Sequence, residues 1–218
     1  MINHHLSDET LWAYVTGSLP AGHALLVSCH LELCKACQGR LAEAEALAGA
    51  LLQTSEQLNT SDELFERLLL RVESEKPSRS LSCISRPKPR QGVPSDLWGV
   101  LGQGYSGIKW KVVGPGIRQF VLPVESSEGE KARLLKLSPG YMTPEHSHHG
   151  SEMTLVLKGS FSDETGRYKV GDVQEADDLV HHQPVADTEE DCICLAVTDA
   201  PLAFKGLLPK LLQPFFGI

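Results

Sequence analysis

The sequence predicts a two-domain protein of mixed class, with a helical domain followed by an all-β domain. Three observations support this division. Apolar residues recur at helical spacing through residues 1–73, a stretch rich in Pro, Ser and basic residues occupies 74–94, and short apolar runs separated by Gly and Pro begin at about residue 95. With 218 residues, 41% of them hydrophobic, the chain is long enough for one large hydrophobic core or two smaller ones.

Four helical segments are expected in residues 1–73. The first begins after Ser7-Asp8-Glu9, which supply a cap and first-turn acids, and it ends at Gly17–Pro20. The second runs from about Gly22 to Leu33, and the third begins near Lys35.

The fourth helical segment begins at the capping pair Ser61-Asp62 and carries an apolar stripe. The stripe consists of Leu64, Phe65, Leu68, Leu69 and Val72. Such a stripe either packs on its own domain or binds a partner protein, and the sequence leaves both interpretations open.

The second half of the chain has the pattern of a β-protein. Residues 74–94 contain four prolines and the isolated Cys83, and they are predicted to form a linker. The apolar runs that follow are short and bounded by turn residues, which is typical of a sandwich or barrel. The expected strands are Ile117–Val124, Ala132–Leu137, Met153–Leu157, Gly166–Val170 and Cys192–Val197.

Composition excludes several classes of protein. The sequence contains no 18-residue apolar stretch and no basic-plus-apolar leader, so neither a membrane span nor a secretory signal is expected. Six cysteines are spread over more than 160 positions, unlike a disulfide framework, which favours a reducing cytoplasm. Cys192 and Cys194 are expected to share one strand face, as core residues or, alternatively, as a redox pair.

Charge is distributed unevenly along the chain. Residues 1–75 carry a net charge of −7, residues 76–94 carry +5, and residues 95–218 carry −6. Phosphates would repel an acidic helical domain, so direct nucleic-acid binding is not expected. A basic protein partner suits this surface better, although the acidic residues can also serve solubility alone.

Histidines and cysteines in the N-terminal region have the spacing of a metal site. In His30-x3-Cys34-x2-Cys37, residues three and four apart are expected to place their donor atoms on one helical stripe. Two imidazoles and two thiolates suit Zn²⁺, and four protein ligands leave no open position for catalysis. His5 directly precedes the first helix and is the favoured fourth ligand, with His4 as the alternative. A redox dithiol or buried core cysteines are the competing interpretations of the cysteine pair.

A second group of potential ligands lies in the β-region. His146, His148 and Glu152 have the same parity, so on one extended strand they would face the same side. His182 would complete a set of three histidines and one glutamate. Mixed nitrogen and oxygen ligation suits Zn, Fe, Mn, Ni or Cu without selecting among them.

These two groups of residues resemble known motifs. The segment from His5 to Cys37 resembles the zinc-binding anti-sigma domain. The segment Gly140-x5-His146-x-His148-x3-Glu152-x6-Gly159 matches the first cupin motif position for position. In this order, and over nearly the whole chain, they resemble the ChrR family of bacterial anti-sigma factors. The second cupin motif is degraded, with Lys169 at the usual proline position and Ala186 at the usual asparagine position.

The resemblance implies an architecture and a function. Residues 1–73 would form a zinc-binding anti-sigma domain, 74–94 a linker, and 95–218 a cupin, which is a double-stranded β-helix or jelly-roll barrel. The helical domain would sequester an extracytoplasmic-function RNA polymerase sigma factor, and the cupin would trigger its release on sensing singlet oxygen or organic peroxide.

The resemblance also implies two metal sites. It assigns structural Zn²⁺ to His5, His30, Cys34 and Cys37. It assigns Zn²⁺ or another divalent transition metal in the cupin to His146, His148, Glu152 and His182. No catalytic residue is assigned.

Two other functions are compatible with these residues. A metal-dependent cupin enzyme, such as a dioxygenase or isomerase, could carry a zinc-bound helical appendage, because an open metal position permits such chemistry. A zinc-bound interaction module that does not bind a sigma factor is the third interpretation. Binding of a sigma factor encoded beside this gene would distinguish an anti-sigma factor from the enzyme and from the sigma-independent module.

Overall fold

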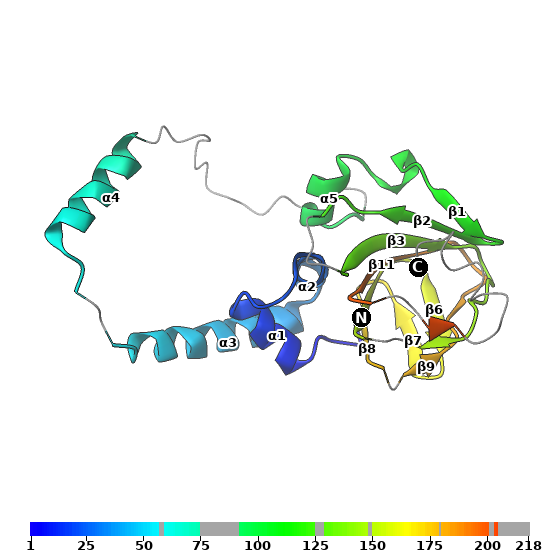
Figure 1. Ribbon diagram of the computed structural model, residues 1–218. Helices are drawn as coiled ribbons and strands as arrows, with labels where there is room; N and C mark the ends of the chain where they lie inside the picture. The colour runs from blue at the N-terminus through cyan, green and yellow to red at the C-terminus, as the bar shows by residue number, and fades with distance from the viewer. Residues whose placement is uncertain are drawn as a thin grey trace.

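The predicted succession of helices and strands is confirmed in a computed structural model. It describes residues 1–56, 59–74, 92–124, 129–147, 150–178 and 180–200, and the backbone of residues 203–204. A helical arm extends from one side of a β-barrel (Figure 1). Within the described residues, every helix is too short or too polar to cross a bilayer.

Three helices form the base of the arm. Helix α1 (Asp8–Val15) is capped by the Ser7 side chain, as its sequence predicts. Helices α2 (Ala21–Leu33) and α3 (Lys35–Gln53) follow, separated by Cys34 alone. The backbone of Cys34 is extended, with φ −112° and ψ 101°, so it ends one helix and begins the next.

The break at Cys34 contradicts the expectation that His30, Cys34 and Cys37 share one helical stripe. On an unbroken helix, His30 and Cys37 would be about 10 Å apart along the axis, too far for one ion. The interruption folds the three side chains toward a common point instead. The single-stripe argument is therefore wrong, whereas the predicted end of the second helix at Leu33 and start of the third near Lys35 are confirmed.

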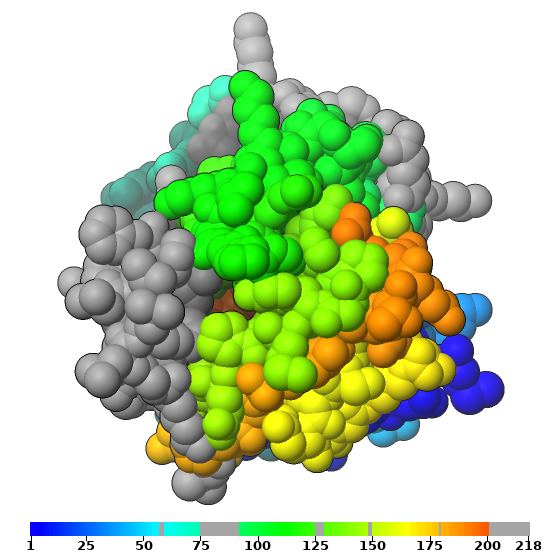
Figure 2. Space-filling model, turned by 90° about the vertical axis from the view of Figure 1, so that its right-hand side faces the viewer, coloured from blue at the N-terminus to red at the C-terminus, as the bar shows by residue number. Residues whose placement is uncertain are grey.

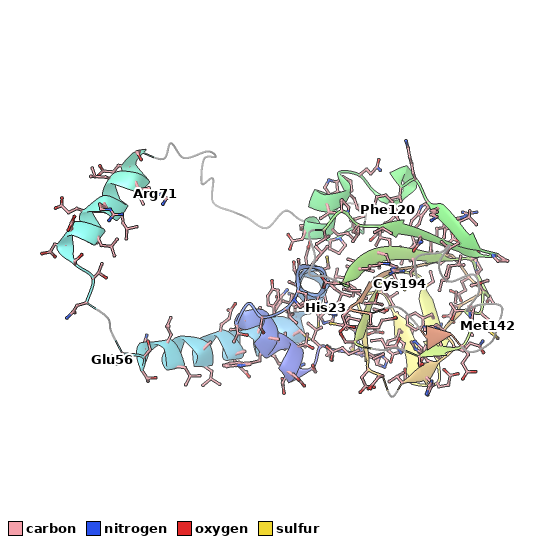
Figure 3. All side chains as sticks on the ribbon, in the orientation of Figure 1. His23, Glu56, Arg71, Phe120, Met142 and Cys194 are labelled. Carbon is pink, nitrogen blue, oxygen red and sulfur yellow. The ribbon has the colours of Figure 1, made fainter. Side chains whose placement is uncertain are left out.

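The fourth predicted helix is present and exposed. Helix α4 (Asp62–Ser74) contains no buried residue. It stands away from the barrel, as the positions of Arg71 on α4 and Cys194 in the barrel show (Figure 3).

A short helix precedes the strands, where the sequence pattern predicted only β-structure. Helix α5 (Ser95–Leu101) ends at Gly102, whose φ of 65° favours glycine. A 3₁₀ turn, η1 (Tyr105–Gly107), follows it. Most of the predicted linker, including Cys83, lies outside the described residues.

The barrel consists of three antiparallel sheets. The largest has the order β1 (Lys111–Gly114), β2 (Ile117–Val121), β3 (Lys131–Leu137), β11 (Cys192–Thr198), β5 (Glu152–Lys158) and β8 (Val173–Ala176). The second has the order β10 (Val185–Ala186), β6 (Ser160–Asp163) and β7 (Gly166–Lys169). The third has the order β12 (Ala203–Phe204), β4 (His146–Ser147) and β9 (His181–His182).

Strands distant in sequence form one continuous surface on the side of the barrel turned away from the arm. There, segments of residues 92–147 lie beside segments of residues 150–200 (Figure 2). This mixing follows from the strand order, in which β11 lies between β3 and β5.

The two faces of the largest sheet have different roles. Side chains alternate along a strand, so on β5 Met153 and Leu155 point to one face while Glu152 and Thr154 point to the other. The face with Met153 and Leu155 belongs to a large apolar core, and Glu152 belongs to a group of potential metal ligands. Strand β5 therefore contributes to both.

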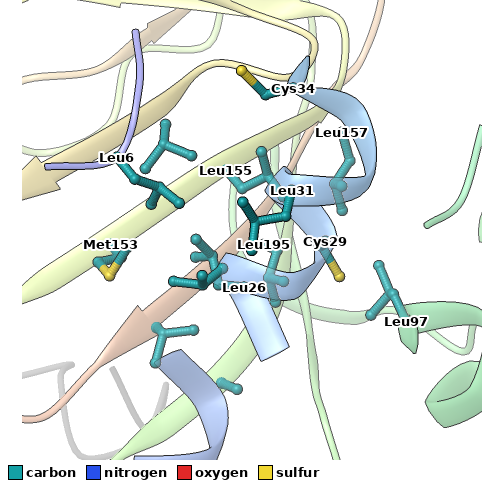
Figure 4. Packing of buried hydrophobic residues seen from close by; sticks show 14 of the residues in the cluster. Leu6, Leu26, Cys29, Leu31, Cys34, Leu97, Met153, Leu155, Leu157 and Leu195 are labelled. Carbon is teal, nitrogen blue, oxygen red and sulfur yellow. The ribbon is translucent and has the colours of Figure 1, made fainter. Parts of the chain in front are cut away.

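Helix α2 packs on the apolar face of this sheet. Leu26 and Leu31 lie against Leu155 and Leu195 (Figure 4), and all four side chains are buried. One hydrophobic core thus spans the base of the helical arm and the barrel. About 25 cal/mol is gained for each square ångström of apolar surface buried there.

A buried carboxylate supplies polar contacts to the same packing. Glu130, just before β3, accepts hydrogen bonds from the backbone N–H groups of Gly22 at 3.1 Å and His23 at 3.0 Å. One carboxylate oxygen also lies 2.7 Å from Nδ1 of His23. The N-cap residue of α2 is Pro20, which offers no side-chain acceptor, so a barrel residue caps the helix.

Candidate metal centres

The N-terminal centre brings together the four expected residues. One donor atom from each of His5, His30, Cys34 and Cys37 lies within 4.8 Å of every other. His5 Nδ1 is 3.2 Å from Cys34 Sγ and 3.6 Å from Cys37 Sγ, and His30 Nε2 is 3.3 Å from Cys37 Sγ. Donors of tetrahedral zinc, with bonds of about 2.0–2.3 Å, stand roughly 3.3–3.8 Å apart. These four residues therefore fit a zinc ion.

His4, the alternative fourth ligand, is directed elsewhere. Its ring lies against Tyr168 with centroids 4.3 Å apart, and its Nδ1 is 3.8 Å from a carboxylate oxygen of Asp172. The structure thus brings His5, and not His4, to the other three donors.

Burial shifts the pKa of two of the donors in this centre. Burial lowers the pKa of His30 to about 4, which keeps its imidazole neutral and its lone pair available. Cys34 and Cys37 lie at the N-terminal end of α3, with Cys34 as its N-cap residue. Burial raises the pKa of Cys37 in the metal-free chain, so metal binding there releases a proton.

A residue of the barrel accepts a hydrogen bond from one of these four residues, His30. His30 Nδ1 is 2.8 Å from the carbonyl oxygen of Gly171, in the turn between β7 and β8. A carbonyl only accepts, so Nδ1 carries the proton, and Nε2 is left with its lone pair toward Cys37.

The second centre lies inside the barrel. His146 on β4, Glu152 on β5 and His182 on β9 each offer a donor atom within 4.8 Å of the others. The two histidine Nε2 atoms are 3.1 Å apart. Nδ1 of His146 donates to the carbonyl oxygen of Pro144 at 2.9 Å, so in the neutral ring Nε2 carries a lone pair. Two lone pairs at this distance repel unless a metal ion or a proton lies between them, so the centre fits a cation.

The same-strand argument for this group is wrong, although His146 and Glu152 do come together with His182. Six residues along one strand span about 20 Å, too far for one ion. His146 and Glu152 instead lie on separate strands, and His146 pairs in register with His182. The predicted ligand His148, and its neighbour His149, lie outside the described residues.

Asp163 is a functional candidate that sequence reasoning missed. Its Oδ2 accepts from His182 Nδ1 at 2.8 Å and from Gln174 Nε2 at 2.7 Å, and its Oδ1 accepts from Thr165 N at 2.8 Å. Burial alone would raise its pKa, but these hydrogen bonds outweigh burial and hold the pKa well below its usual range. A carboxylate that fixes the second nitrogen of a histidine ligand is a common outer partner in metal sites.

Two further cysteines occupy the barrel interior. The Sγ atoms of Cys192 and Cys194 are 3.6 Å apart as free thiols, and both residues are buried. They pack with Phe161 and Tyr168 in a second apolar cluster, as the core interpretation predicted. A hydrogen bond to Cys192, together with burial, raises the pKa of Cys194 well above its usual range.

The α4 stripe faces solvent. Its five side chains are between 43 and 69% exposed. The distal half of α3 adds Leu47, Leu51 and Leu52, which are 54–74% exposed. The structure therefore presents apolar side chains on both distal helices of the arm.

Comparisons with known proteins cover both parts of the chain. The family described as the ChrR cupin-like domain matches residues 104–201. The anti-sigma-E factor ChrR of Cereibacter sphaeroides is 39% identical over 222 residues, which span 100% of this chain and 99% of the relative. A chain in the crystal structure of Rhodobacter sphaeroides SigE in complex with the anti-sigma ChrR superposes with a TM-score of 0.77 and 34% identity. That match covers 91% of this chain and 100% of the other.

Proposed function

Because the chain belongs to the ChrR family of anti-sigma factors, we propose that it sequesters an extracytoplasmic-function sigma factor of RNA polymerase. A solved relative was crystallised with the sigma factor SigE. The acidic arm suits a protein partner better than DNA, because residues 1–75 carry a net charge of −7. Such a partner acts in the cytoplasm, which agrees with the free thiols of the five described cysteines.

The exposed stripe on α4 is the observation that carries this proposal. A helix of 13 residues is marginally stable by itself in water. Each half-exposed Leu or Phe of the stripe forfeits roughly 1 kcal/mol that full burial would supply. A partner groove that covers Leu64, Phe65, Leu68, Leu69 and Val72 would recover this free energy and stabilise the helix.

A pair of leucines on α4 provides a matched test. Leu68 belongs to the stripe, whereas Leu70 is 64% exposed and lies about 200° away around the helix. Binding of the sigma factor encoded beside this gene is measured by calorimetry with the full chain. Leu68→Asp is expected to weaken binding by about 2–4 kcal/mol, or roughly 30- to 1000-fold. Leu70→Asp is expected to bind within about 3-fold of wild type. Equal effects of the two substitutions would contradict a role for the stripe.

We further propose that the N-terminal centre holds structural Zn²⁺. The supporting observation is the convergence of two imidazole nitrogens and two sulfur atoms at tetrahedral distances. Zinc bound there would supply folding free energy and no catalysis, because the four residues fill its coordination. His5 would tie the N-terminal segment to α2 and α3, and so fix the base of the arm.

For the barrel, we propose a sensory role that depends on Zn²⁺ or another divalent transition metal. His146, Glu152 and His182 would hold the ion, with His148 as the further expected ligand. Singlet oxygen or organic peroxide would change this centre and lower the affinity for the sigma factor. Strand β5 supports the proposal, because it bears Glu152 on one face and packs against α2 through the other. Sigma affinity that stays constant after exposure to both oxidants would argue against it.

A further inference from the structure

We propose that the barrel turn at Gly171 and Asp172 is a positioning element of the N-terminal metal centre. The proposal rests on zinc occupancy of that centre, and it adds residues from the barrel to a site built otherwise from the arm. The turn lies between β7 and β8 and more than 130 residues beyond the last ligand, Cys37.

The first contact of the turn orients His30. The carbonyl oxygen of Gly171 accepts from His30 Nδ1 at 2.8 Å, and His30 is fully buried. Rotation of the buried imidazole would break this hydrogen bond. The contact therefore fixes which nitrogen points at Cys37 Sγ, 3.3 Å from Nε2.

The second contact of the turn orients the segment that carries His5. Asp172 is fully buried, and its Oδ1 accepts from the backbone N–H groups of Asn3 at 2.6 Å and His4 at 3.0 Å. The carbonyl of His4 in turn accepts from Val173 N at 3.3 Å. Both backbone polar groups of His4 are thus held, and His5 is the next residue.

The turn also packs against the N-terminal segment without room for a side chain at Gly171. Gly171 has a φ of 92°, and a Cβ there would lie 2.6 Å from Cδ1 of Ile2. The turn consequently packs closely against the N-terminal segment. Through one backbone carbonyl and one carboxylate, it positions two of the four ligands.

Cobalt(II) provides a probe that is specific for this centre. Thiolate-to-cobalt charge-transfer absorption arises where cysteine is a ligand, so it reports on Cys34 and Cys37 and not on the barrel centre. The full chain is titrated with cobalt(II) in competition with a chelator of known affinity. Outer partners of metal ligands contribute about 10- to 100-fold to metal affinity. Asp172→Asn is therefore expected to raise the Kd of the thiolate centre by about 10- to 100-fold.

Two other variants make the result decisive. Glu175→Gln is the matched control, because exposed Glu175 on β8 accepts one hydrogen bond, from Ser7 N at 3.2 Å. It is expected to change the Kd by less than about 3-fold. Asn3→Pro removes one N–H donor to Asp172 while leaving the barrel intact, and it covers the case in which Asp172→Asn fails to fold. It is also expected to weaken cobalt binding.

The outcomes separate the inference from its premise. Wild-type affinity in both Asp172→Asn and Asn3→Pro would overturn the positioning role of the turn. Absence of the charge-transfer band in the wild-type chain would overturn the zinc centre itself, and the inference with it. Weakened binding in both variants, with Glu175→Gln unchanged, is the expected result.

Discussion

Replacing Glu130 by Gln tests whether the arm and the barrel fold as one unit. The Glu130 side chain is 1% exposed and accepts three hydrogen bonds from two residues of α2. A glutamine side chain has one acceptor oxygen, and its NH₂ group is a donor that cannot accept from the N–H groups of α2. At least one buried N–H group would therefore lose its partner, and the negative charge at the helix N-terminus would also be lost.

The expected effect follows from these contacts. Hydrogen bonds to a charged group contribute about 1.5–3 kcal/mol each, and a charge at a helix end contributes about 0.3–1 kcal/mol. Allowing one hydrogen bond to survive, we expect Glu130→Gln to lower the free energy of unfolding by about 2–4 kcal/mol. With a urea m-value of about 2 kcal/mol/M, the midpoint would fall by about 1–2 M.

Urea unfolding followed by circular dichroism measures this change. We expect one cooperative transition, because a single hydrophobic core includes α2 and the largest sheet. The exposed Glu175→Gln variant should remain within about 0.5 kcal/mol of wild type. A Glu130→Gln midpoint equal to that of this control would refute the reasoning, since the buried carboxylate would then contribute nothing to docking.

Two further predictions concern the metal centres. Asp163→Asn should weaken metal binding in the barrel by about 10- to 100-fold, because His182 loses its charged partner, whereas the cobalt–thiolate band should persist. Competition with a chelator measures the metal affinity of the barrel centre. Equal affinities of wild type and Asp163→Asn would exclude the role of Asp163. In the metal-free chain, His30 has a pKa of about 4, below the value of about 6.5 in an unfolded chain, so its contribution to stability is complete above pH 6.5 and is lost as pH falls toward 4. Urea midpoints of wild type and His30→Gln across this range should converge as the pH falls, and a constant difference between them would contradict the assigned pKa.

The sequence located much of both metal centres because ligand chemistry restricts residue type and spacing. His5, His30, Cys34 and Cys37 were found in this way. The boundary between the two helices was also predicted, but the convergence of His30, Cys34 and Cys37 across the extended Cys34 was not, because the argument placed them on one helical stripe. Helix α5 was missed because seven residues provide too little periodicity to separate a helix from a strand.

Long-range polar contacts were beyond the reach of sequence patterns. Asp163 stands before Glu-Thr-Gly, which reads as an ordinary turn, and only the closed barrel brings it to His182. Glu130 and Gly22 are 108 positions apart, and neither belongs to a recognisable motif. The exposure of α4 was likewise undecided, because an amphipathic stripe looks the same whether its partner lies in the same chain or in another.

Transcription in vitro tests the proposed anti-sigma activity most directly. RNA polymerase is combined with the sigma factor encoded beside this gene and a promoter that this sigma factor recognises, and the full chain is then added in increasing amounts. We expect transcript to disappear near one chain per sigma factor, to persist with Leu68→Asp, and to return when the complex is exposed to singlet oxygen or organic peroxide. Undiminished transcript in the presence of excess folded, zinc-loaded wild-type chain would contradict the anti-sigma function.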